Sequence, residues 1–242
     1  MDGDPHNGPA RTTTVSGQLQ VRAAMLTDKG CVRSSNEDRV LYTIPDAGKA
    51  DAALGTLALV ADGMGGHAAG EVASAIAATT IHYLYYRQKR PTPEALAEAF
   101  AAANLAIHER SKSDPACNGM GTTCTAIVVR DSHIWLGHVG DSRAYLIRRG
   151  KLYRISEDHS LVAEMVKQGA LTEQEARTFP DRNVILKALG IRPEVEPMIW
   201  GEGLPGRAGD VLVLCSDGLS DVLEDEQIRQ LALSGPPFEA AQ

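Results

Sequence analysis

Residues 57–67 read Leu-Ala-Leu-Val-Ala-Asp-Gly-Met-Gly-Gly-His, and this stretch decides the fold of the chain. The apolar run Leu57–Ala61 has the length of a buried strand and ends on the carboxylate of Asp62. Glycines then allow the backbone to turn sharply before a helix that we expect to begin near Glu71. A strand that ends in this way directs a carboxylate and exposed carbonyl groups into one space.

A second apolar strand ends in the same manner near the other end of the chain. Residues 211–218 read Val-Leu-Val-Leu-Cys-Ser-Asp-Gly, so Asp217 follows this strand as Asp62 follows the first. The two strand ends could together bring oxygen ligands around a hard cation such as Mg2+ or Mn2+. The alternative is that each Asp-Gly pair only makes a turn.

Two further clusters combine acids with an arginine. Residues 33–38 read Arg-Ser-Ser-Asn-Glu-Asp, and residues 140–143 read Gly-Asp-Ser-Arg. In the first cluster, the planar guanidinium of Arg33 could hold a phosphate dianion beside a metal near Glu37 and Asp38. The alternatives are a solvated charged loop for the first cluster and a hairpin turn for the second.

Short apolar runs that are typical of strands recur along the chain, and turn residues separate several of them by two to five positions. This spacing favours antiparallel hairpins over parallel crossovers. The predicted strands are Leu19–Leu26, Val40–Ile44, Thr56–Ala61, Thr123–Val129, His133–His138, Ala144–Ile147, Leu152–Ile155 and Val211–Cys215. With no repeat and no linker, we expect one α+β domain over residues 19–242, after a flexible tail over residues 1–18.

Two longer helices should pack together on one face of a sheet. The first is expected over about 71–88, and the second begins with Thr92 as N-cap and Pro93 in the first turn. The predicted apolar stripes are Val72, Ile76, Thr79 and Tyr83 in the first helix, and Leu96, Phe100, Ala103 and Ile107 in the second. Shorter helices are expected at Leu161–Gln168, Glu173–Phe179 and Glu226–Leu233.

Composition narrows the classes of function. The 242 residues carry a net charge of −7, which argues against non-specific binding of nucleic acid. No run has the length needed to span a bilayer, and no secretory signal is visible, so we expect a cytoplasmic protein that does not bind membranes. The four cysteines lack Cys-x-x-Cys spacing and should be reduced, with Cys215 in the core.

Six motifs follow one another along the chain. They are Arg-x-x-Asn-Glu-Asp at 33–38, Asp-Gly-Met-Gly-Gly-His at 62–67, Gly-Thr-Thr at 121–123, Gly-Asp-Ser-Arg at 140–143, Asp-His-Ser at 158–160 and Ser-Asp-Gly at 216–218. In this order they resemble the metal-dependent protein phosphatase 2C family in its bacterial form. The resemblance covers about residues 20–235, and six ordered motifs are far more specific than any one of them.

The resemblance implies a sandwich of two antiparallel β-sheets flanked by α-helices. It also implies two bound Mn2+ or Mg2+ ions. Asp62 matches the aspartate that bridges them, Gly63 matches the residue whose carbonyl binds one of them, and Asp217 matches a further ligand.

The resemblance gives roles to four more residues. Glu37 and Asp38 match acids that hold metal-bound waters, Arg33 matches the arginine that binds the substrate phosphate, and Asp141 matches the position of a third, weaker ion. The implied reaction is in-line attack on phosphorus by a water that bridges two cations, while the serine or threonine oxygen leaves. No phosphoenzyme is required.

The general acid is less clearly marked. In animal-type members a histidine directly follows the Asp-Gly pair, whereas Met64 stands at that position here and the nearest candidate is His67. His67 could protonate the leaving alkoxide, or it could only cap the following helix.

One departure from the family concerns the end of the sequence. Family members usually continue into Asp-Asn-Ile-Thr and a valine-rich strand, whereas this sequence ends at Gln242. The domain is therefore expected to lack the family's last strand and one metal-ligand aspartate. Truncation, a strand supplied by a partner or swapped protomer, and a weakened phosphatase retained for binding are the competing explanations.

These observations favour a protein-serine/threonine phosphatase that acts on phosphorylated proteins, the products of a serine/threonine kinase. Two other functions stay open. One is a non-enzymatic module that binds phosphoproteins, and the other is a metal-dependent hydrolase of small phosphate esters.

Overall fold

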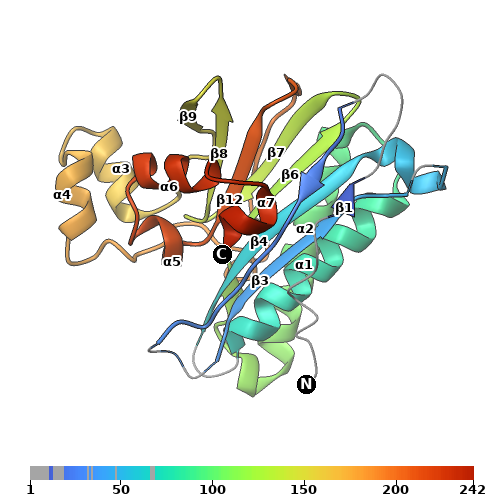
Figure 1. Cartoon of the computed structure of the whole chain (residues 1–242). Helices are drawn as coiled ribbons and strands as arrows, with labels where there is room; N and C mark the ends of the chain where they lie inside the picture. The colour runs from blue at the N-terminus through green and yellow to red at the C-terminus, as the bar shows by residue number, and fades with distance from the viewer. Residues whose placement is uncertain (1–10, 13–18, 32, 34, 47, 66–68) are drawn as a thin grey trace.

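The computed structural model describes residues 11–12, 19–31, 33, 35–46, 48–65 and 69–242. It has four layers (Figure 1). Helices α1 (Ala69–Arg87) and α2 (Thr92–Ser113) cover one face of a large sheet, and a small sheet packs against the other face. Helix α6 (Asp225–Ala232) covers the outer face of the small sheet. This arrangement confirms the predicted α+β sandwich of two antiparallel sheets.

The large sheet holds β4 between β3 and β6, next to the β3 edge. Its strands run in the order β10-β7-β6-β4-β3, while β5 pairs with β4 and β11 pairs with β7, all antiparallel. The bounds are β3 (Asp38–Thr43), β4 (Thr56–Met64), β5 (Gly121–Thr122), β6 (Cys124–Arg130), β7 (His133–Val139), β10 (Met198–Ile199) and β11 (Leu204–Pro205). Strand β4, which contains residues 57–61, is thus hydrogen-bonded to β3 on one side and to β6 on the other.

The small sheet has the order β12-β8-β9, with bounds β12 (Val211–Cys215), β8 (Arg143–Arg148) and β9 (Lys151–Arg154). Successive side chains of a strand point to opposite faces, and β8 follows this rule. Ala144 packs in the core between the two sheets, while Tyr145 packs against α6. Two short strands near the N-terminus, β1 (Arg11–Thr12) and β2 (Arg22–Ala23), pair with each other.

Helix α1 buries mainly small side chains, and the stripe predicted for it is wrong at Thr79 and Tyr83, whereas Val72 and Ile76 pack against the core. Ala73, Ala77 and Ile81 are fully buried, whereas Thr79 is exposed and the side chain of Tyr83 is 51% exposed. Alanines on the sheet side allow the helix backbone to approach β4 closely, and Ile81 and Tyr85 complete the buried face in the last turns of the helix.

Helix α2 follows the prediction more closely. The predicted stripe of Leu96, Phe100, Ala103 and Ile107 is fully buried. The predicted cap is wrong, because Thr92 is already helical and Pro91 stands at the N-cap without a side-chain hydrogen bond.

The remaining helices are short. The three predicted short helices are confirmed as α3, α4 and α6. The others are α5 and α7, with two 3-10 turns, η1 and η2. The bounds not yet given are α3 (Leu161–Lys167), α4 (Glu173–Thr178), α5 (Asp217–Ser220), α7 (Pro237–Ala241), η1 (Ala50–Leu54) and η2 (Pro115–Cys117).

Seven of the eight predicted strands correspond to strands of the structure. The exception is 19–26, of which only the two residues of β2 are strand, because β2 pairs only with the equally short β1. Of the predicted tail, Arg11–Thr12 form β1, and the other positions before residue 19 lie outside the described residues.

The four cysteines are free, as predicted, and Cys215 is buried. No helix in the described part of the chain combines the length and the apolar character needed to cross a membrane.

Candidate active site

Asp38 and Asp62 lie side by side on neighbouring strands. They are register partners in the antiparallel β3–β4 pair, at the start of β3 and near the end of β4. Residues directly opposite each other in such a pair project to the same face of the sheet, so their carboxyl groups are neighbours.

The second Asp-Gly strand end reaches this pair from the small sheet. Asp217 is the first residue of α5, directly after β12 and Ser216. The Ser216 hydroxyl donates a hydrogen bond of 2.8 Å to Asp38 Oδ2, which joins positions 178 residues apart in the sequence. The charge of Asp217 therefore acts on both Asp38 and Asp62.

Asp141 enters the same region from the turn between β7 and β8. The Asp62 N–H donates to Thr123 Oγ1 at 2.9 Å, and Thr123 Oγ1 lies 2.7 Å from Ser142 Oγ. Thr123 and Ser142 are both buried. Their hydroxyl pair connects the backbone of Asp62 to the turn that carries Asp141, whose charge acts on Asp62.

Burial and mutual repulsion disfavour ionisation of these acids. Burial, reinforced by the charges of Asp38 and Asp217, raises the pKa of Asp62 to about 9. Burial, reinforced by Asp217 and Asp158, raises the pKa of Asp141 to about 7. Burial also raises the pKa of Asp38. A divalent cation among these groups would stabilise their charged forms.

The donor set fits a hard divalent cation, because carboxylate oxygens are the ligands that Mg2+ and Mn2+ prefer. Among the described residues, however, no three His, Cys, Asp or Glu side chains are already arranged as a metal cage. The acids instead act on one another through their charges, since Asp38, Asp217 and Asp141 all add to the effect of burial in raising the pKa of Asp62. The predicted ligands thus come together, and the assignment of ions to them stays a prediction.

Gly63 permits the close contact between β4 and the start of α1. A Cβ on Gly63 would lie 2.1 Å from the carbonyl oxygen of Gly70, so no larger residue fits. The Gly63 N–H donates to the carbonyl of Glu37 at 3.2 Å, and the Ser74 hydroxyl donates to the same carbonyl at 2.6 Å. These contacts fix the strand end beside Glu37, while the carbonyl of Gly63 as a metal ligand stays a prediction.

Arg33 places an exposed cation beside the acids. Its Nη1 lies 3.2 Å from Glu37 Oε2, and its side chain is 71% exposed while that of Glu37 is 10% exposed. Burial raises the pKa of Glu37, although the charge of Arg33 opposes this effect. A guanidinium that is anchored on one side and open on the other can accept a phosphate dianion.

His67, the candidate general acid, lies outside the described residues. Whether His67 protonates the leaving alkoxide or caps the following helix therefore stays a prediction.

Several residues of the site had no predicted role. Thr122, Thr123, Ser142 and Ser216 orient the acids through hydroxyl groups, and Thr122 Oγ1 donates to the carbonyl of Asp62 at 2.8 Å. Each of them belongs to one of the six motifs, so membership of a motif was the sequence signal that could have identified them. Asp221 also had no role predicted from the sequence. The pKa of Asp221 is raised, mainly by burial and secondly by the charge of Asp217.

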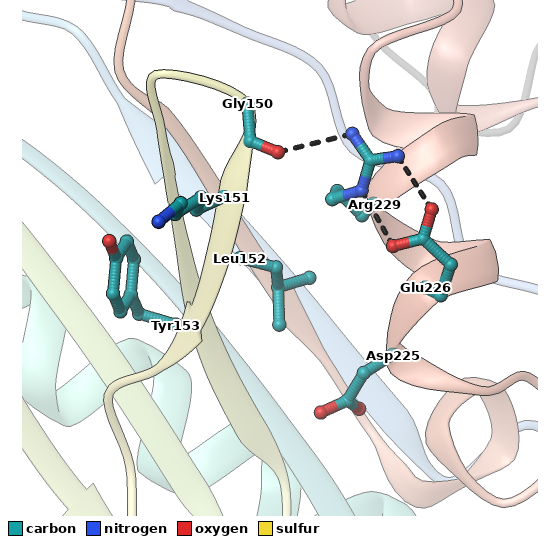
Figure 2. A pocket seen from close by; sticks show the side chains of 7 residues that line it. All are labelled: Gly150, Lys151, Leu152, Tyr153, Asp225, Glu226 and Arg229. Carbon is teal, nitrogen blue, oxygen red and sulfur yellow. Dashed lines mark hydrogen bonds and ion pairs between the residues drawn. The ribbon is translucent and has the colours of Figure 1, made fainter.

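A surface pocket of about 670 Å3 lies elsewhere, between β9 and α6 (Figure 2). In it, Arg229 is paired with Glu226 and donates a hydrogen bond to the carbonyl of Gly150 at 3.1 Å. The lining includes none of the acids described above, so this pocket is separate from the candidate active site.

A family model described as protein phosphatase 2C matches residues 33–239. The serine/threonine protein phosphatase PstP of Mycobacterium tuberculosis is 41% identical over 213 residues, which cover 87% of this chain and 38% of that protein. The chain thus spans well under half the length of that relative. The protein phosphatase PhpP of Streptococcus pneumoniae is 36% identical over 219 residues, with 89% of this chain and 85% of that protein covered.

A solved structure is also similar. It is the catalytic domain of PstP in complex with two manganese ions, which superposes with a TM-score of 0.75 and 36% identity. The match covers 96% of this chain and 86% of that one.

Proposed function

Since the chain belongs to the protein phosphatase 2C family, we propose that it hydrolyses phosphoserine and phosphothreonine in proteins in a metal-dependent reaction. One observation carries the proposal. Asp38, Asp62, Asp141 and Asp217 come from four distant segments and influence one another in a partly buried cluster next to Arg33. Such a cluster is costly to fold unless it binds a cation.

The residues of the cluster divide the work. Asp62 and Asp217 would hold two divalent ions, Mn2+ or Mg2+, with the carbonyl of Gly63, and Asp141 would hold a third, weaker ion. When bound, the ions supply a water of lowered pKa for attack on phosphorus. Asp38 is held by the Ser216 hydroxyl, so its carboxylate keeps a fixed direction.

Arg33 and Glu37 form the substrate side of the site. Arg33 neutralises the phosphate and orients it for in-line attack, and its contact with Glu37 sets the direction of the guanidinium. His67 is the proposed donor of a proton to the leaving alkoxide.

The substrates would be phosphorylated proteins made by a serine/threonine kinase, and the place of action would be the cytoplasm. The relatives PstP and PhpP are named as protein phosphatases, which supports this choice of substrate class.

The test compares the purified chain with the variant Asp62→Asn on a phosphothreonine peptide and on a small aryl phosphate, each with added Mn2+. We expect turnover of the peptide by the parent chain and a loss of at least about a thousandfold in Asp62→Asn, because the variant loses the charge shared by both ions. Asp131→Asn is the matched control, since Asp131 lies in the exposed β6–β7 turn at a φ of 48°, which asparagine tolerates.

Three other results would contradict the proposal. Full activity of Asp62→Asn would show that the acidic cluster takes no part in the reaction. Tight binding of the peptide without hydrolysis under saturating Mn2+ would favour a binding module. Turnover of the aryl phosphate alone would favour an esterase of small molecules.

A further inference from the structure

The turn that presents Asp141 is unusually constrained. Gly140, directly before Asp141, has a φ of 111°, a region that favours glycine. A Cβ at Gly140 would lie 2.5 Å from the Cβ of Thr123, so the turn is pressed against the start of β6. The direction of Asp141 therefore depends on what holds the peptide groups on either side of Gly140.

One residue, His159, binds both backbone polar groups of Gly140. The Gly140 N–H donates to His159 Nδ1 at 3.1 Å, and the His159 N–H donates to the Gly140 carbonyl at 2.7 Å. A backbone N–H can only donate, so Nδ1 must be the unprotonated acceptor nitrogen of the ring. Gly140 is buried, so loss of this acceptor would leave an unpaired buried N–H.

His159 is itself held in place by two further contacts. Its carbonyl accepts a hydrogen bond of 2.7 Å from the N–H of Leu186. Its ring stacks on the buried ring of His138, with centroids 4.9 Å apart. The His138 ring is in turn bonded to Thr125 Oγ1 at 2.8 Å and to the carbonyl of Glu157 at 2.9 Å.

We propose that His159 is a positioning residue, which fixes the direction of Asp141 by accepting the Gly140 N–H at Nδ1. The inference rests on the proposed function, because Asp141 matters there as a ligand of the weaker ion. In this proposal the acceptor atom Nδ1, and not the stacking of the ring on His138, fixes the direction of Asp141.

Two substitutions separate the acceptor from the ring. His159→Phe keeps an aromatic ring on His138 and removes the acceptor. His159→Asn removes the ring and keeps an oxygen, Oδ1, close to the position of Nδ1. A role in packing alone would make the phenylalanine variant the milder of the two, whereas positioning through Nδ1 makes the asparagine variant the milder.

The readout is Mn2+ binding, followed by the electron paramagnetic resonance signal of the free ion, with turnover of a phosphothreonine peptide measured in parallel. Asp141→Asn identifies the binding event that depends on Asp141. We expect His159→Phe to weaken the same event about tenfold, since an unpaired buried N–H costs about that factor. His159→Asn should stay within about threefold of the parent chain, and the tighter binding events should not change.

Thermal unfolding of each variant shows whether it is folded. If His159→Phe does not fold, His159→Asn alone decides, because parent-like binding supports the inference and a tenfold loss overturns it. Parent-like binding by His159→Phe, or absence of any change in Asp141→Asn, also overturns it. A parent chain that binds Mn2+ without turnover refutes the proposed function instead, and the comparison of the two His159 variants still holds.

Discussion

Asp62 is the residue on which the site depends. Both of its backbone polar groups are bonded, with the N–H donating to Thr123 Oγ1 and the carbonyl accepting from Thr122 Oγ1. Burial raises its pKa, and its side chain is close enough to Asp38 and Asp217 for both charges to raise this pKa further. The sequence predicted this acid and Asp217 because an apolar strand followed by Asp-Gly is a local pattern.

The hydroxyl groups around Asp62 could not be predicted in the same way. The contact of Asp62 with Thr123 spans 61 positions and that of Asp38 with Ser216 spans 178, and no spacing rule describes such pairs. The motifs marked these residues, whereas their partners are set by the pairing of distant strands in the large sheet and by the contact between the two sheets.

At the same scale, the phosphate contact gives a prediction. Arg33→Ala should raise the KM for a phosphothreonine peptide about tenfold or more and change kcat less, because the proposed contact of Arg33 with the phosphate forms before the reaction and persists during it. The KM of Arg33→Lys should fall between those of the parent chain and Arg33→Ala, since lysine keeps the charge and loses the planar fork. Steady-state kinetics at saturating Mn2+ measure both values, and an unchanged KM in Arg33→Ala would exclude the proposed contact.

Among the elements, the contact between β4 and α1 matters most for the site. Gly63 and Gly70 meet backbone to backbone, and a Cβ on Gly70 would lie 2.8 Å from the carbonyl carbon of Gly63. This approach sets where the strand end and its acid lie relative to the first turn of the helix.

The β4–α1 contact predicts the sign of a substitution effect. Alanine in place of a helical glycine usually stabilises a protein by up to about 1 kcal/mol. Gly70→Ala should instead destabilise the chain by about 1–3 kcal/mol, because the added methyl group overpacks the contact. Urea unfolding checks this, with Gly201→Ala as control, since a Cβ at exposed Gly201 meets nothing within 4 Å. Gly70→Ala that is as stable as the parent would contradict the tight contact.

Elements with a local signal were predicted well. The strands of the two hairpins β6–β7 and β8–β9 follow short apolar runs joined by turn residues, and the structure confirms them. The two-residue strands β5, β10 and β11 were missed, because two residues carry no periodicity. The buried face of α1 was mispredicted because its alanines carry a weaker apolar signal than Val72 or Tyr83.

At the scale of the whole molecule, the fold brings like charges together. The free energy of unfolding should therefore depend on pH. Asp62 has a folded-state pKa of about 9, far above that of an unfolded aspartate. The folded chain therefore holds a proton that the unfolded chain releases, so stability falls as pH rises towards 9. The buried His138, whose folded pKa is lowered to about 4, gives the opposite slope, but only below about pH 7.

In EDTA between pH 7 and 8.5, the free energy of unfolding should therefore decrease with pH, with a slope of at most about 1.4 kcal/mol per pH unit from Asp62. Saturating Mn2+ should remove most of this decrease, because bound cations favour the ionised acids. Asp62→Asn should remove most of this decrease without metal; the remainder comes from Asp141, whose pKa is raised to about 7, and from the buried thiols of Cys124 and Cys215, whose pKa values burial also raises. Urea midpoints measured across this range provide the check, and an undiminished slope in Asp62→Asn would assign the effect to other groups.

We propose that Asp62 and Asp217, delivered by two different sheets, bind a shared pair of divalent ions. Anomalous diffraction at the manganese edge from crystals grown with Mn2+ tests it most directly. The account predicts two peaks, each about 2.1 Å from an oxygen of Asp62, one of them also in contact with Asp217. Crystals in which no manganese peak lies within bonding distance of Asp62 would contradict it.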